Sequence, residues 1–74
     1  MDKITQKIQN WMKSLDDNSK MRFALNWSRP HSIFKVASKI YDGDKQDLQN
    51  CNWFEIWRAK DMGKWANDNN VFCQ

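Results

Sequence analysis

The fold of this chain depends on residues 30–43, which read PHSIFKVASKIYDG. As a strand, this stretch alternates, with Phe34 and Val36 on one side and Lys35 between them on the other. As a helix, it gathers its large apolar residues on one face, begins with a proline and ends before a glycine, as many helices do. The stretch fits an all-helical or a mixed fold, so the neighbouring segments must decide between the two.

The segments on either side favour strands. Residues 21–27, MRFALNW, alternate large apolar side chains with small or polar ones, as a half-buried strand does. Residues 53–58, WFEIWR, and residues 64–66, KWA, fit a hairpin whose turn lies at 61–63, where Gly63 can take a positive φ. Clusters rich in Asp, Asn, Ser and Gly recur along the chain, and the segments between several of them are about seven to nine residues long, a length commoner for strands.

The N-terminal segment, by contrast, predicts a helix over residues 3–15. Asp2 precedes it and can cap its first turn, and the polar run at 16–19 favours a turn that ends it. Lysine, glutamine and asparagine occupy the face opposite to the apolar residues. The apolar positions, which recur at helical spacing, are Ile4, Ile8, Trp11, Met12 and Leu15.

We therefore predict a single α+β domain over residues 1–74, in which an N-terminal amphipathic helix packs on a small antiparallel sheet of three to four strands. The alternative is an all-α fold of three to four short helices. One glutamate and three leucines are a poor supply of helix formers, but one threonine and two valines are equally poor for strands. In the mixed fold, the sheet face that receives the helix would carry Phe23, Leu25, Trp27, Phe34, Val36, Ile40, Phe54 and Ile56.

Charge and hydropathy predict a cytoplasmic protein. Twelve Lys and Arg against nine Asp and Glu give a net charge of +3, which permits nucleic-acid binding without requiring it. No apolar run approaches the roughly 20 residues of a membrane span, and charges occupy the N-terminus where a signal peptide would be apolar. Lys, Asn, Asp and Ile are plentiful while Gly, Ala and Pro are scarce, which indicates an AT-rich gene such as those of phages and mobile elements.

The residues that could carry chemistry are few and scattered. Cys51 and Cys73 can form one bridge at most and lack metal-ligand spacing, so we interpret them as reduced thiols and leave their pairing open. His31, the only histidine, follows a proline and is interpreted as a turn residue. The three aspartates within residues 42–47 do not fit a calcium loop and are interpreted as an exposed acidic turn. We therefore expect no catalytic residue, no metal and no cofactor.

The aromatic content points instead to binding. Five tryptophans, four phenylalanines and one tyrosine are too many large rings for so small a protein to bury completely. Tryptophan, tyrosine and arginine dominate the binding energy of protein interfaces. On the outer face of the predicted sheet and beside it lie the candidate partner-binding residues Arg22, Lys35, Lys39, Trp53, Trp57 and Arg58.

These observations predict a small non-enzymatic binding protein that blocks or modulates a protein partner, as an accessory or inhibitor protein of a phage or mobile element does. The alternative is a protein that binds single-stranded RNA or DNA with the same face, its rings stacking on bases and its cations meeting phosphates. A homodimer, in which the exposed rings of two copies meet, is a third interpretation.

Overall fold

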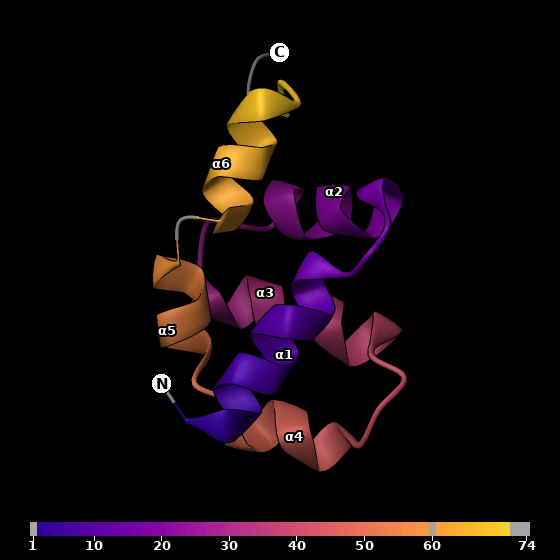
Figure 1. Ribbon diagram of the computed structural model, residues 1–74, viewed down its shortest axis with the longest axis vertical. Helices are drawn as coiled ribbons and strands as arrows, with labels where there is room; N and C mark the ends of the chain where they lie inside the picture. The colour runs from indigo at the N-terminus through magenta and orange to yellow at the C-terminus, as the bar shows by residue number, and fades with distance from the viewer. Residues whose placement is uncertain (1, 60, 72–74) are drawn as a thin grey trace.

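The computed structural model describes residues 2–59 and 61–71 and is shown in Figure 1. Within these residues the chain forms helices and no strand, so the α+β prediction is wrong and the all-α alternative gives the fold class. The described helices outnumber the three to four of that alternative. They are α1 (Lys3–Lys13), α2 (Asp17–Leu25), α3 (Pro30–Ile40), α4 (Lys45–Asn50), α5 (Trp53–Arg58) and α6 (Asp61–Asp68).

Polar caps explain why so many short helices form. Four helices begin at an Asp or Asn whose side chain accepts a hydrogen bond from a backbone N–H of the first turn. The clusters that we interpreted as turns between strands therefore include helix starts. The predicted cap of the first helix by Asp2 is confirmed. The four caps are Asp2 for α1, Asp16 for α2, Asp44 for α4 and Asn52 for α5.

Each predicted strand lies wholly or largely in a helix. Residues 21–27 form the second half of α2 and the turn after it, and residues 30–40 form α3 with Pro30 in its first turn. The predicted hairpin is instead the pair α5 and α6, and Gly63 lies inside α6 without a positive φ. The physical reason is length, because a segment of six to nine residues contains too few repeats to separate a period of 2 from a period of 3.6.

The main core lies among α1, α3, α4 and α5, and Phe23 from α2 and Met62 from α6 complete it. In Figure 1, α1 crosses in front of α3. Thr5 of α1 is buried beside this core. The half-buried rings of Trp11, Trp27, Trp53 and Trp57 pack against its outside. The buried core residues are Ile8, Met12, Phe23, Ile33, Ala37, Tyr41, Leu48, Cys51, Ile56 and Met62.

A second, smaller cluster attaches α6 to α2. Ala24 of α2 and Ala66 of α6 are buried together with Val71, and Trp65 packs against them. Asn70 takes a left-handed conformation after α6, and the Val71 N–H donates to the Ala66 carbonyl at 2.9 Å, which turns Val71 back toward the cluster. Figure 1 shows α6 beside α2 at one end of the molecule, with α4 at the opposite end.

The described helices are short relative to a lipid bilayer. The longest, α1 and α3, have 11 residues each, whereas a membrane-spanning helix needs roughly 20. No helix in the described part of the chain is long and apolar enough to cross a membrane.

Candidate functional site

The predicted partner-binding residues lie on three helices, with α3 in contact with both of the others. Arg22 is exposed on α2, Lys35 and Lys39 are exposed on α3, and Arg58 is exposed on α5. α3 packs against α5 and against α2. Trp53 and Trp57, the remaining two, are half-buried on α5.

Both α5 tryptophans are fixed by internal hydrogen bonds. The Trp53 indole N–H donates to the Leu48 carbonyl at 2.7 Å, and its ring meets the Phe34 ring edge-on at a centroid distance of 5.6 Å. The Trp57 indole N–H donates to the Trp27 carbonyl at 3.2 Å. Because these polar groups are already bonded, the two rings can offer a partner apolar contact but no free N–H.

Phe54 is the exposed aromatic residue of α5. Its side chain is 55% exposed, its ring lies 5.5 Å from the Trp57 ring, and the Arg58 guanidinium lies 5.7 Å from its centroid. We call Phe54, Trp57 and Arg58 the α5 patch. A large exposed ring that lies next to a second ring and an arginine has the composition of a binding hot spot.

Sequence reasoning placed Phe54 on the wrong side of its element. A strand points Phe54 and Ile56 to the same face, but residues two apart in a helix lie on nearly opposite sides, so the burial of Ile56 turns Phe54 outward. A signal for the helix was present in the sequence. Asn52 is followed three residues later by Glu55, the pattern of a capped helix start, and the Asn52 side chain accepts from the Glu55 N–H at 3.1 Å.

An open hollow of about 260 Å³ lies between α2 and α3. Arg22 and Lys39, both exposed, line it together with two half-buried apolar residues. The Asn26 amide donates to the Arg22 carbonyl at 2.8 Å and so closes the end of α2. We call this site the basic hollow, and its residues are Arg22, Asn26, Val36, Lys39 and Ile40.

Charge is distributed unevenly along the chain. Residues 18–41 contain five Lys and Arg and no Asp or Glu, whereas the remainder contains seven basic and all nine acidic residues. Two ion pairs occur among the described residues, Lys7–Asp47 at 2.8 Å and Lys13–Asp61 at 3.0 Å, and neither involves residues 18–41. The net charge of the whole chain conceals this separation, which is why sequence reasoning missed it.

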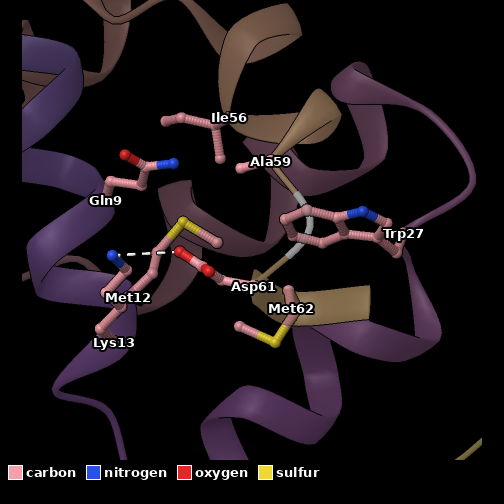
Figure 2. A pocket seen from close by; sticks show the side chains of 8 residues that line it. All are labelled: Gln9, Met12, Lys13, Trp27, Ile56, Ala59, Asp61 and Met62. Atoms are coloured by element: carbon pink, nitrogen blue, oxygen red, sulfur yellow. Dashed lines mark ion pairs between the residues drawn. The ribbon is translucent and has the colours of Figure 1, made fainter. Parts of the chain in front are cut away.

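A second pocket, at the junction of α1, α5 and α6, is too small to hold an organic ligand. Figure 2 shows its lining, with the Met12 and Met62 side chains and the Trp27 ring around the space and the Lys13–Asp61 ion pair beside it. Its free volume is about 20 Å³, which is room for roughly one water molecule. We interpret this pocket as a small packing gap at the edge of the core, open toward the exposed Lys13 and Asp61.

The groups considered for chemistry have structural roles or lie apart. Burial raises the pKa of the Cys51 thiol to about 11, so it is protonated at neutral pH and unreactive; Cys73 lies outside the described residues. Asp44 caps α4, and Asp47 accepts hydrogen bonds from Lys7 and Tyr41. The site can therefore offer aromatic contact and positive charge to a ligand.

Comparisons of the chain with protein-family models, with curated proteins and with solved structures found no significant match.

Proposed function

We propose that this chain is a small non-enzymatic binding protein that docks on a protein partner through the α5 patch and blocks or modulates that partner. The observation that carries the proposal is Phe54, which is 55% exposed and lies next to Trp57 and Arg58. Exposing a large ring costs solvation free energy, about 1.5–3 kcal/mol for a complete side chain, that burial against a partner would recover.

The α5 patch is preorganised for binding. Trp57 is anchored through its indole N–H to the Trp27 carbonyl, and Arg58 is held near the Phe54 ring. Side chains that are already ordered lose little conformational entropy when a partner arrives, so more of the contact energy appears as affinity. Interface energy is concentrated in such aromatic and arginine anchors.

The adjoining helices extend the contact face. The exposed Lys35 and Lys39 lie one turn apart on α3, which packs against α5, and Arg22 lines the same hollow as Lys39. A chain docked through this face would cover part of the partner's surface. Such steric occlusion is the simplest way for so small a chain to block another protein. An accessory or inhibitor role in a phage or mobile element agrees with the small size of the chain and with the amino-acid composition, which indicates an AT-rich gene.

A second candidate function, binding of single-stranded nucleic acid, is favoured by the acid-free segment 18–41. Its exposed cations could meet phosphates while Phe54 stacks on a base. The two functions respond differently to salt. Binding to phosphates weakens steeply as salt increases, whereas a desolvated aromatic interface is much less sensitive.

Site-directed crosslinking tests the proposed function. The chain would carry a photoreactive phenylalanine analogue at position 54, or at exposed Gln6 on α1 as a control. Each version would be added to a lysate of the cells in which its gene is expressed, with and without nuclease. We expect position 54 alone to crosslink one protein, in a nuclease-resistant manner. Crosslinks of equal yield from both positions, crosslinks that disappear with nuclease, or no crosslink at all would contradict the proposal.

A substitution at the same residue then measures affinity for the crosslinked protein. Because Phe54 is exposed, Phe54→Ala should leave the fold intact and weaken binding by at least tenfold, and Gln6→Ala should change neither. Calorimetric titration gives the affinities, and circular dichroism confirms that both variants are folded. Unchanged affinity in Phe54→Ala would remove the α5 patch from the interface.

A further inference from the structure

The basic hollow combines an apolar floor with a cationic rim. Val36 and Ile40 of α3 are half-buried and supply the floor, while Arg22 of α2 and Lys39 of α3 are exposed and supply the charge. Its volume of about 260 Å³ is large enough to receive a side chain, and it is open to solvent. The hollow therefore offers two different kinds of contact within one site.

We propose that the basic hollow binds an acidic segment of the protein partner, with an apolar side chain of that segment on Val36 and Ile40 and flanking carboxylates on Arg22 and Lys39. This inference deepens the proposed function and rests on it, because it states the chemistry of the partner. The planar guanidinium of Arg22 can bind a carboxylate through two parallel hydrogen bonds, and Lys39 supplies a second, more mobile charge.

The segments that line the hollow carry no acidic residue of their own. The nearest acidic group for which an effect on the hollow is seen is Asp16, the cap of α2, whose pKa is lowered by the hydrogen bonds that it accepts as a cap and in smaller part by the charge of Arg22. No acidic residue occurs between positions 18 and 41, and none of the ion pairs among the described residues neutralises Arg22 or Lys39. Arg29 and Lys35 add further exposed positive charge to the same acid-free segment. This arrangement attracts an acidic surface and orients it during encounter.

Exposed apolar residues on α2 favour a protein segment over a phosphate backbone. Met21 is 38% exposed and Leu25 is 62% exposed, and their i,i+4 spacing makes them a stripe on α2 beside Arg22. Phosphates and sugars gain little from apolar contact, whereas a peptide that alternates acidic and apolar side chains can use the stripe, the floor and the rim together.

The hollow and the α5 patch lie on a surface that α3 connects. Phe34 of α3 meets the Trp53 ring of α5, while Val36 and Ile40 of α3 face the α2 side. At helical spacing, the exposed Lys35 falls between these two sides on the outer arc of α3. One partner can therefore contact the α5 patch and reach the basic hollow across α3.

A titration followed by amide NMR spectra of the isotope-labelled full chain tests the inference. The probe is a synthetic 12-residue peptide of Glu and Asp with leucine at every third position; its control is the same peptide with serine replacing each leucine. A 12-nucleotide oligothymidylate is the third probe. We expect the leucine peptide to shift the resonances of the basic hollow and to bind at least tenfold more tightly than the serine peptide.

A charge-matched pair of double variants sharpens the titration. Arg22→Gln with Lys39→Gln should weaken binding of the leucine peptide at least tenfold. Lys3→Gln with Lys64→Gln removes the same net charge from exposed positions outside residues 18–41 and should weaken it less than threefold. If the two double variants lost the same affinity for the leucine peptide, overall charge alone would explain the binding, and the inference would be overturned.

The remaining outcomes also decide the matter. Tighter binding of oligothymidylate than of the leucine peptide would overturn the inference in favour of nucleic acid, and the absence of peptide shifts in the hollow would overturn it outright. The double variant should also lose at least tenfold in affinity for the partner that crosslinks at position 54. If that affinity falls in Phe54→Ala but not in Arg22→Gln with Lys39→Gln, the proposed function stands and the basic hollow fails.

Discussion

The end of the molecule around α4 and the face formed by α2 and α3 use charged residues in different ways. At the α4 end, Asp47 accepts from both Lys7 and Tyr41, and the Lys45 ammonium donates to the Ser38 and Tyr41 carbonyls. On the α2–α3 face, Arg22 and Lys39 stay exposed around a hollow. Charges of the first kind contribute to the fold, whereas those of the second kind are free to meet a partner.

The largest expected effect comes from breaking the network that joins α1 to the start of α5. The Thr5 hydroxyl is fully buried, donates to the Asp2 carboxylate at 2.9 Å and accepts from the Asn52 N–H at 3.0 Å. Thr5→Val keeps the shape but leaves the Asn52 N–H without its partner, so we expect a loss of about 2 kcal/mol in the free energy of unfolding. Chemical denaturation measures it.

Thr5→Ser is the matched control for this prediction. It retains the hydroxyl and removes one methyl group, so its loss should be about 1 kcal/mol, smaller than that of Thr5→Val. A larger loss in Thr5→Ser would show that packing, rather than hydrogen bonding, dominates at this position.

The loop between α3 and α4 gives a smaller effect. A methyl group on Gly43 would lie 2.5 Å from the end of the buried Tyr41 ring, which must then move and weaken its hydrogen bond to Asp47. We expect Gly43→Ala to cost about 1 kcal/mol, at the lower end for overpacking because the atoms displaced lie at the tip of a side chain.

Gly63 provides the opposite control within the same chain. No atom lies within 4 Å of the position that its methyl group would take, and Gly63 is inside α6. Gly63→Ala should therefore stabilise the protein by about 0.5–1 kcal/mol, because alanine is the better helix former. Thermal unfolding of the two variants should show midpoints that move in opposite directions, and movement in the same direction would contradict both assignments.

Acid should weaken the α4 end. Hydrogen bonds from Lys7 and Tyr41 hold the pKa of Asp47 below its ordinary value of 3.8. A carboxyl group with a depressed folded pKa stabilises the fold above its unfolded pKa, and this contribution is lost as the pH falls through the folded pKa. As the pH falls from about 5 to about 2.5, the free energy of unfolding should therefore decrease less in Asp47→Asn than in the unsubstituted protein. Chemical denaturation at several pH values measures this difference, and the same pH dependence in both proteins would contradict the role of Asp47.

The smallest effect on stability is expected on the α2–α3 face. Arg22→Gln with Lys39→Gln should change the free energy of unfolding by less than about 0.5 kcal/mol, because both side chains are exposed and neither takes part in an ion pair among the described residues. Denaturation of this double variant beside Asp47→Asn tests the contrast directly. A loss above about 1 kcal/mol would assign these cations a structural role.

The first helix and its cap at Asp2 could be predicted from the sequence, but the fold class could not. Residues 3–15 repeat their apolar spacing for three turns, and the structure confirms a helix from Lys3 to Lys13. α5 has only six residues, so Trp53, Phe54, Ile56 and Trp57 satisfied the strand pattern as well as the helical one. Asn52, which caps α5, was the better sequence signal for a helix at this position.

The candidate site was predictable in part. Arg22, Lys39 and Arg58 were expected at the surface and are exposed there, because long charged side chains are rarely buried. The positions of the tryptophans depend on carbonyl partners at Leu48 and Trp27 that no local pattern reveals. The prediction that these residues contact a partner is tested by the crosslinking and titration experiments.

The attachment of α6 implies that the native state opens unevenly. Ala24 and Ala66 let α6 and α2 approach closely, and Trp65 and Val71 pack beside them. Met62 is the α6 residue that joins the main core, so α6 shares less buried apolar surface with the rest of the chain than the central helices do. Subglobal unfolding of α6 should therefore require less free energy than global unfolding, and its amides should exchange with solvent before those of α3. A protease would then cut first in α6 and leave the α2–α3 face and the α5 patch folded.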